Sequence, residues 1–111
     1  MERSNIGYVA PARPSKPKVA AWLIDAAGHT YQLYQNETTI GRLTENDIQC
    51  KDTTVSRRHA KIVERNGHFT IVDLGSPNGT RVNGRRINTP FALGPDDEIQ
   101  VGDNTVYRFK S

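Results

Sequence analysis

Two asparagine–glycine pairs, each placed beside short runs of β-branched and aromatic residues, constrain the fold of this chain more than any other feature. Asn66-Gly67 lies between Lys61–Glu64 and Phe69–Val72, and Asn83-Gly84 follows Thr80–Val82. Asparagine and glycine supply the two positive φ angles of a type I′ turn, whose twist matches that of two antiparallel strands. Each pair therefore predicts a β-hairpin.

The rest of the chain after Val19 continues this pattern of short strands separated by turn residues. The predicted strands are rich in Val, Ile, Thr, Tyr and Phe, which suit a pleated surface. They are Ala20–Asp25, Tyr31–Tyr34, Thr38–Arg42, His59–Glu64, Phe69–Asp73, Thr80–Val82, Glu98–Val101 and Thr105–Phe109. No window of about 11 residues keeps the apolar period of a helix. The pattern predicts an all-β fold, an antiparallel sandwich.

The first 18 residues differ in composition from the rest. Residues 10–18 contain three prolines and no large apolar side chain. Proline fixes φ and lacks an amide donor, so we expect a flexible tail over residues 1–18. We interpret it as a solvated spacer, with contact to an acidic partner or a membrane surface as the alternative. Residues 19–111 are expected to form one domain, since 111 residues suffice for only one.

The net charge of +3 and the isoelectric point near 9.2 raise the question of nucleic-acid binding. Residues 1–18 carry the whole excess, because residues 19–111 hold 11 basic and 11 acidic side chains. A folded body with no net charge offers no broad basic surface to a phosphate backbone. We therefore expect no nucleic-acid partner.

The sequence also argues against membrane insertion and metal binding. No apolar run approaches the ~20 residues that span a bilayer, and the N-terminus lacks the apolar core of a signal peptide. We expect a cytoplasmic protein without a membrane partner. Cys50 is the single cysteine, which excludes an internal disulfide. With three scattered histidines it provides no metal-ligand spacing, so neither a metal nor a cofactor is expected.

Function in a sandwich of this kind usually lies on the loops at one end, because the sheets hold those loops in place. Four loop segments carry suitable polar groups: Gly41-Arg42, Ser56–His59, Gly75–Thr80 and Asn83-Gly84. Together they offer guanidinium, hydroxyl and carboxamide groups. These groups suit a doubly charged oxyanion on one side and a peptide backbone on the other.

The order of these segments resembles that of the forkhead-associated (FHA) domain family. Gly-Arg, Ser-x-x-His, Asn-Gly-Thr and Asn-Gly follow one another over a match from about Val19 to Lys110. Residues 54–60, Thr-Val-Ser-Arg-Arg-His-Ala, are similar to those of small bacterial members. The resemblance implies a β-sandwich of about eleven short strands, with its binding loops at one end, that recognises phosphothreonine peptides.

The resemblance assigns phosphate contacts to three residues. Arg42 matches the family arginine that contacts the phosphate, and Ser56 matches the serine whose hydroxyl donates to it. Arg57 occupies a position where the family often has a basic or amide contact to the phosphate. Arg58 is left as a contact at the rim, since neighbouring side chains at a strand start alternate in direction.

The peptide contacts implied by the resemblance involve two loops. Asn78 matches the asparagine that bonds the main chain of the ligand; a left-handed turn residue is the alternative interpretation of this position. Thr54, Val55, Ser76 and Pro77 are predicted to line the peptide. Pro77 departs from the threonine of many members, so any hydroxyl contact there is lost. Thr54 stands where some members have a basic residue that selects an acidic side chain three positions after the phosphothreonine. Because Thr54 carries no charge, we expect only a weak preference for an acidic residue there.

Four further residues are expected to shape the site rather than to touch the ligand: Gly41, His59, Gly79 and Asn83. We interpret the glycines as turn positions that need backbone freedom. His59 is expected to orient its loop through side-chain hydrogen bonds. A catalytic group of Ser56, His59 and Asp73 is disfavoured, because the spacing provides no nucleophile elbow.

The sequence therefore predicts a non-catalytic, monomeric module that binds a partner after a Ser/Thr protein kinase has phosphorylated a threonine in it. The partner is that phosphothreonine protein, either the kinase or one of its substrates. Two alternatives stay open: a scaffold that binds proteins without reading phosphate, and nucleic-acid binding through the hairpin that carries Arg81, Arg85 and Arg86. Those arginines are otherwise interpreted as a solvated face.

Overall fold

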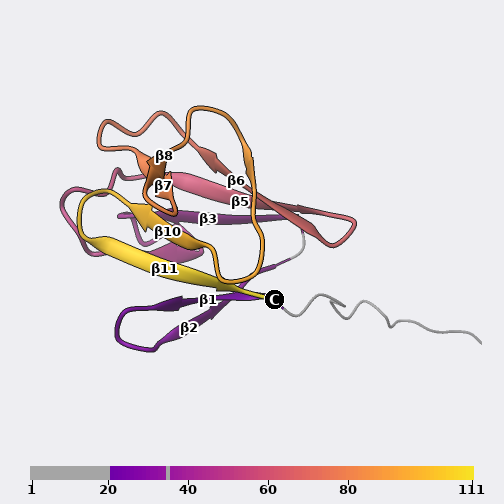
Figure 1. Ribbon diagram of the computed structural model, residues 1–111. Helices are drawn as coiled ribbons and strands as arrows, with labels where there is room; N and C mark the ends of the chain where they lie inside the picture. The colour runs from indigo at the N-terminus through magenta and orange to yellow at the C-terminus, as the bar shows by residue number, and fades with distance from the viewer. Residues whose placement is uncertain (1–20, 35) are drawn as a thin grey trace, which may run out of the picture.

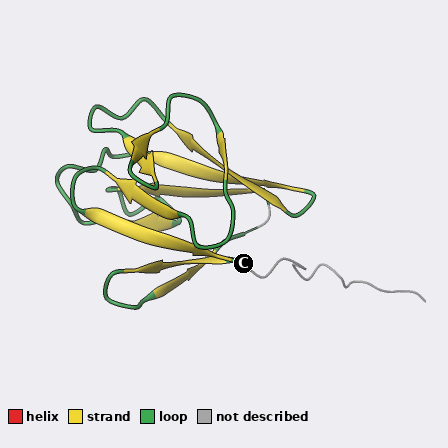
Figure 2. Cartoon of the chain, viewed as in Figure 1, coloured by secondary structure: helices red, strands yellow, loops and turns green. Residues whose placement is uncertain are grey.

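The computed structural model describes residues 21–34 and 36–111, and these residues contain eleven strands and no helix (Figures 1 and 2). The described part therefore holds no helix that could cross a membrane. The predicted tail over residues 1–18 and the start of the first predicted strand at Ala20 lie outside the described residues.

The strands form two sheets. In chain order they are β1 (Trp22–Asp25), β2 (Thr30–Gln32), β3 (Glu37–Gly41), β4 (Ile48–Gln49), β5 (Ala60–Arg65), β6 (His68–Asp73), β7 (Thr80–Val82), β8 (Arg85–Arg86), β9 (Phe91–Ala92), β10 (Glu98–Val101) and β11 (Thr105–Lys110). One sheet has six strands in the order β2-β1-β11-β10-β7-β8, and the other has five in the order β4-β3-β5-β6-β9. The all-β prediction is confirmed.

Both predicted hairpins are present, and their turns have the expected geometry. Asn66 and Gly67 have φ angles of 55° and 82°, and Asn83 and Gly84 have 53° and 84°. All four are positive, as a type I′ turn requires. These turns connect β5 to β6 and β7 to β8.

One strand pair departs from the antiparallel prediction. β3 and β4 run parallel, with Ile40 opposite Ile48. The chain leaves β3, crosses residues 42–47 and returns beside the same strand in the same direction. β4 and β9 have only two residues each, too short for a recognisable alternation, and for this reason the sequence did not predict them.

The core lies between the sheets and is built from alternate residues of the longer strands. Its largest fully buried side chains include Leu23, Ile62, Ile99 and Phe109. Burial of each such side chain contributes roughly 1.5–3 kcal/mol. Phe69 of β6 and Phe109 of β11 pack with ring centroids 5.5 Å apart, which joins one sheet to the other.

The strand registers bring four loops to one end of the sandwich. Ala60 pairs with both Ile40 and Asp73, so the end of β3, the start of β5 and the end of β6 lie side by side. In the other sheet Thr80 pairs with Val101, which places the start of β7 beside the end of β10. The loops that leave these strand ends gather at the left of Figure 1, opposite the β5–β6 turn.

Candidate functional site

Arg42 is the first residue after β3, and two hydrogen bonds tie it to the loop before β5. Its backbone N–H donates to the Ser56 carbonyl at 3.0 Å, and its side-chain Nε donates to the Val55 carbonyl at 3.0 Å. The two terminal guanidinium nitrogens donate to no acceptor within residues 21–34 and 36–111. The Nε hydrogen bond holds the guanidinium group in place. Because the side chain is exposed, its terminal nitrogens are open to an external anion.

Ser56 and Arg57 lie directly beside this arginine. Ser56 is half-buried, whereas Arg57 and Arg58 are exposed. The Arg57 carbonyl accepts hydrogen bonds from Asn46 Nδ2 at 2.8 Å and from the Leu43 N–H at 3.3 Å. The loop is therefore fixed through its backbone, and the side chains of Arg57 and Arg58 remain exposed to solvent.

His59 is fully buried and links two loops through both ring nitrogens. Nδ1 accepts from the Ser56 N–H at 3.0 Å, and Nε2 lies 2.8 Å from the Gly79 carbonyl. Because Nδ1 accepts and a carbonyl only accepts, the proton of the neutral ring is on Nε2. Neither nitrogen faces the Ser56 hydroxyl, so this geometry provides no base for a nucleophilic serine.

Asn78 lies in the loop between β6 and β7 and contacts the loop before β5. Its Nδ2 donates to the Thr54 carbonyl at 2.8 Å, and the side chain is exposed. The positive φ angles of this loop belong to Gly75 and Gly79, both at 83°, and not to Asn78. The alternative interpretation of Asn78 as a left-handed turn residue is therefore wrong.

Ser76 differs from the prediction that its side chain lines the peptide. It is buried, with its hydroxyl donating to Asp73 Oδ1 at 2.5 Å and accepting from the Gly79 N–H at 3.1 Å. The Thr80 hydroxyl donates to the same carboxylate oxygen at 2.7 Å. Burial alone would raise the pKa of Asp73, but these donors hold it below its ordinary value. Ser76 thus stabilises the loop, while Pro77 remains exposed.

Val55 and Thr54 also direct their side chains elsewhere than predicted. Val55 is in the core, and only its carbonyl reaches the site, through Arg42. The Thr54 hydroxyl donates to Asp52 Oδ1 at 2.7 Å and accepts from the Asp103 N–H at 2.9 Å. The Thr54 side chain is engaged because the loop turns around the Asp52 carboxylate, whereas the Val55 side chain packs in the core.

Gly41 is required by a close approach, not by the turn freedom that the sequence suggested. Its φ is not positive. A Cβ at this position would overlap the Arg57 carbonyl oxygen and lie 2.7 Å from Asn46 Nδ2. Gly79 does match the expected turn freedom, since it has a φ of 83° and the atom nearest to a Cβ there belongs to the flexible side chain of Arg86.

Asn83 is distant from this site, contrary to the prediction. The β7–β10 ladder runs from Thr80 opposite Val101 to Val82 opposite Ile99, and Asn83 follows at the far end. There its amide bonds Asp97 at 2.9 Å and accepts from the Glu98 N–H at 2.9 Å. Asn83 therefore fixes the opposite end of β7.

Three residues that shape the site were missed by the sequence analysis. Asn46 is buried and bonds the Leu43 and Arg57 carbonyls. Arg86 donates to the Ser76 and Pro77 carbonyls at 3.4 and 3.3 Å. Asp52 holds the loop before β5. None of these contacts has a local signal, except that an aspartate two residues before a threonine is typical of an Asx turn.

The described residues bring no group of three or more His, Cys, Asp or Glu side chains into an arrangement that could hold a metal ion. The side chains that converge at this end of the sandwich are those of Arg42, Ser56, Arg57 and Asn78. We call this set the loop site.

Comparison with known protein families decides the relationship. The family described as the FHA domain matches residues 38–102. The chain belongs to the FHA domain family. The resemblance found in the sequence is confirmed, and with it the sandwich of eleven strands.

Two curated relatives of this FHA domain are bacterial proteins. It is 46% identical over 76 residues to the oxoglutarate dehydrogenase inhibitor of Corynebacterium diphtheriae, covering 68% of this chain and 52% of that protein. It is 43% identical over 76 residues to the glycogen accumulation regulator GarA of Mycobacterium tuberculosis, covering 68% of this chain and 46% of GarA. The chain spans about half the length of the curated relatives it matches.

Solved structures show the same FHA fold. The structure of Mycobacterium tuberculosis EmbR in complex with a low-affinity phosphopeptide has a TM-score of 0.80 and 36% identity, covering 89% of this chain and 26% of that chain. A structure from a structural and functional analysis of phosphothreonine-dependent FHA domain interactions has a TM-score of 0.78 and 30% identity. The match covers 84% of this chain and 97% of that chain.

Proposed function

We propose that this chain is a non-catalytic module that binds phosphothreonine peptides and so mediates phosphorylation-dependent protein–protein interaction. The observation that carries the proposal is the convergence of Arg42, Ser56 and Asn78 from three loops, joined by the bonds from Arg42 to the loop before β5 and from Asn78 to Thr54. Family membership and the two phosphopeptide-related FHA structures support it.

The phosphate is the anchor of this proposed interaction. Its charge of about −1.5 to −2 at neutral pH is nearly balanced by Arg42 and Arg57. The tether at Nε leaves the terminal nitrogens of Arg42 for two charge-assisted hydrogen bonds, each worth roughly 1.5–3 kcal/mol. The Ser56 hydroxyl supplies a third donor beside them.

Asn78 would set the position of the peptide backbone. One N–H of its amide is used on the Thr54 carbonyl, which fixes the orientation of the group. The second N–H and Oδ1 then remain as a donor and an acceptor, the pair that a peptide unit requires. Pro77 and the carbonyls of this loop would extend the contact.

Threonine is preferred to serine, on this proposal, because the loop site also accommodates the γ-methyl group. Burial of one methyl is worth about 0.8 kcal/mol, or roughly fourfold in affinity. Thr54 carries no charge, and its hydroxyl is engaged by Asp52. We therefore expect weak selection for an acidic residue three positions after the phosphothreonine.

We infer that the partner is a Ser/Thr protein kinase or a kinase substrate, and that the module acts as a monomer in the cytoplasm without binding nucleic acid. The names of the relatives, an enzyme inhibitor and a regulator, are consistent with a role in which binding to a phosphorylated protein changes its activity.

Isothermal titration with one threonine peptide in phosphothreonine, phosphoserine and unmodified forms tests the proposal. We expect binding in the order phosphothreonine, phosphoserine, then none, with a dissociation constant near micromolar, about −8 kcal/mol. Arg42→Ala should remove detectable binding, while Arg85→Ala, a matched change at another exposed arginine, should not. Equal binding of the three forms would indicate a scaffold, and binding of DNA that falls steeply with salt would indicate a nucleic-acid protein.

A further inference from the structure

Beside the loop site, the segment of the β6–β7 loop that precedes Asn78 exposes only apolar side chains. Leu74 and Pro77 are exposed, Gly75 between them has no side chain, and Ser76 is buried. We call Leu74, Gly75 and Pro77 the apolar rim. Singly exposed apolar residues are common on protein surfaces, so the position of Leu74 decides what its exposure means.

His59 connects Leu74 to the loop site. The Leu74 N–H donates to the His59 carbonyl at 2.9 Å, and the His59 ring bonds the Ser56 N–H and the Gly79 carbonyl. Ser56, Leu74 and Gly79 therefore surround one buried residue. A ligand that contacts both Ser56 and Asn78 consequently passes beside the apolar rim.

The backbone of the apolar rim is fixed before a ligand binds. Asp73 Oδ2 accepts from the N–H groups of Gly75 and Ser76, each at 3.0 Å. Arg86 donates to the Ser76 and Pro77 carbonyls that follow. Ordering a loop on binding costs conformational entropy, and here the fold supplies that order in advance. A ligand contact with the rim therefore requires the ordering of side chains only.

The charged groups next to the apolar rim are engaged within the protein. Asp73 accepts from the hydroxyls of Ser76 and Thr80 at one carboxylate oxygen and from two backbone N–H groups at the other. Arg86 directs a terminal nitrogen at the carbonyls of the loop. The rim therefore favours an apolar flanking residue of a ligand over a charged one, because only the apolar residue loses no hydration that it needs.

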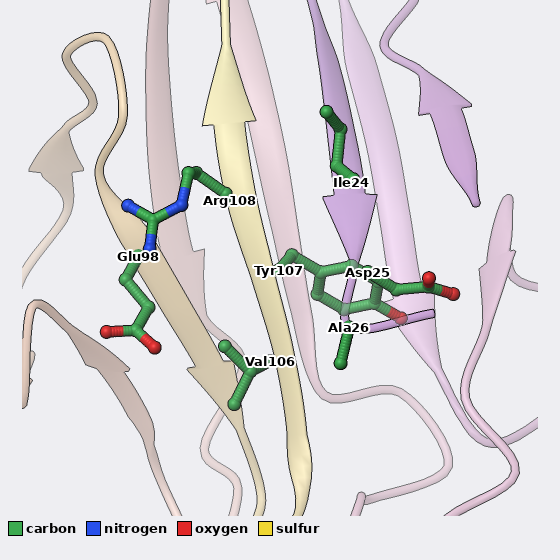
Figure 3. A pocket seen from close by; sticks show the side chains of 7 residues that line it. All are labelled: Ile24, Asp25, Ala26, Glu98, Val106, Tyr107 and Arg108. Carbon is green, nitrogen blue, oxygen red and sulfur yellow. The ribbon is translucent and has the colours of Figure 1, made fainter. Parts of the chain in front are cut away.

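A depression elsewhere on the surface offers no comparable selectivity. Figure 3 shows this depression of about 190 Å³, with Asp25, Glu98 and Arg108 among the residues that line it. Glu98 lies opposite Arg108 in the ladder of β10 and β11, so charges of both signs meet there. The depression is lined by β1, β10, β11 and the turn after β1, and it shares no residue with the loop site. A change there serves as a control.

We propose that Leu74 is a specificity-determining residue, and that the module selects phosphothreonine peptides with an aliphatic side chain close to the phosphothreonine. This inference rests on the proposed function. The phosphate contacts Arg42 and Ser56, and Asn78 bonds the main chain of the ligand. One flanking side chain packs on Leu74 and Pro77, which removes apolar area from water and adds affinity without altering the phosphate contacts.

A positional set of phosphothreonine peptides, titrated against the full chain, tests the inference. Each position before and after the phosphothreonine is occupied in turn by leucine, lysine or aspartate, in a peptide that otherwise contains alanine. We expect leucine at one of these positions to bind at least fivefold more tightly than alanine, lysine or aspartate. The Leu74 methyl resonances should shift more with this leucine peptide than with the alanine peptide.

Substitutions then assign the selectivity to Leu74. Leu74→Ser should remove the preference for leucine and leave the affinity for the alanine peptide within twofold of the wild type. Leu74→Lys should favour aspartate at the same position, a gain that loss of stability cannot produce. Phe91→Ser is the matched control, since Phe91 and Leu74 are both 39% exposed, and it should keep the preference for leucine. Arg108→Ala, in the depression of Figure 3, should keep it too.

Several results would overturn the inference. Phosphothreonine peptides that bind equally whatever residue flanks them would exclude it and leave the proposed function standing, whereas failure of every phosphorylated peptide to bind would exclude both. A wild-type preference for aspartate would assign the flanking contact to the exposed arginines. A preference for leucine that persists in Leu74→Ser, or Leu74 methyl resonances that respond equally to both peptides, would place the contact on another residue.

Discussion

At the scale of single residues, the loop site depends on groups that do not touch the ligand. His59 joins the Ser56 segment to Gly79, and Gly41 allows the Arg57 carbonyl to come close to β3. A sequence motif can identify such residues but not explain them. Gly41 illustrates the difference, because the motif suggested a flexible turn and the structure shows a lack of space for a Cβ.

Replacement of Gly41 by alanine tests this close approach. We predict that Gly41→Ala lowers the free energy of unfolding by roughly 1–3 kcal/mol, as overpacking does, and weakens phosphopeptide binding at least tenfold because the Arg57 segment must move. Urea unfolding and calorimetric titration measure the two effects. Gly94→Ala is the matched control, since its Cβ would meet only Asp97 Oδ2 at 3.8 Å. Equal stability of the two variants would contradict the explanation.

Replacement of His59 tests the link between the loops. His59→Ala leaves the half-buried Ser56 N–H without its partner, which costs roughly 1–3 kcal/mol, and leaves the Gly79 carbonyl with only the Gly102 N–H as a donor. We predict a large loss of stability, measured by thermal unfolding, with loss of phosphopeptide affinity. His68→Ala, at an exposed position of β6, should change neither. A stable His59→Ala variant with wild-type affinity would show that the link is dispensable.

At the scale of elements, loops are held by strands that follow them much later in the chain. Asp52 bonds Thr54 within its own loop and also accepts from the Thr105 hydroxyl of β11 at 2.8 Å. Arg86 of β8 supports the Ser76 and Pro77 carbonyls of the loop before β7. These contacts could not be predicted from local pattern, because they arise only once the registers of both sheets are set.

The Asp52 contacts predict a dependence of stability on pH. Hydrogen bonds from Thr54, with a further one from Thr105, lower the pKa of Asp52 from 3.8 to about 2. A carboxylate whose pKa is lowered by folding stabilises the fold at every pH above its pKa in the unfolded chain. This contribution to the free energy of unfolding is lost as the pH falls from about 4 toward 2. Asp52→Asn should flatten unfolding curves over that interval. Asp103→Asn, in the neighbouring turn, should show the same dependence of stability on pH as the wild type. An identical pH dependence in Asp52→Asn and Asp103→Asn would contradict the assignment of this effect to Asp52.

The support from β8 predicts a selective effect on ligand binding. We predict that Arg86→Ala weakens phosphopeptide binding by a few-fold, through the Asn78 loop, with little loss of stability since the side chain is exposed. Calorimetric titration of Arg86→Ala beside Arg85→Ala measures this. An identical affinity of the two variants would mean that the loop before β7 needs no support from β8.

At the scale of the whole molecule, the sequence predicted the class of fold and the family, because the Asn-Gly turns and the alternation within long strands are local. It did not predict the two-residue strands β4 and β9 or the parallel pairing of β3 with β4. For the loop site, the motif grouped Arg42, Ser56 and Asn78 correctly in one region. The inward side chains of Val55 and Ser76 and the distant position of Asn83 required the tertiary structure.

The central claim is that loops from both sheets meet at one end of the sandwich to bind a phosphothreonine peptide. The most direct measurement is the mapping of amide chemical shifts while a phosphothreonine peptide, and then its unmodified form, is added to the chain. We predict that the phosphorylated peptide shifts the amides around Arg42, Ser56 and Asn78, and that the unmodified peptide shifts none of them. Shifts confined to other surfaces, or equal shifts with both peptides, would contradict the account.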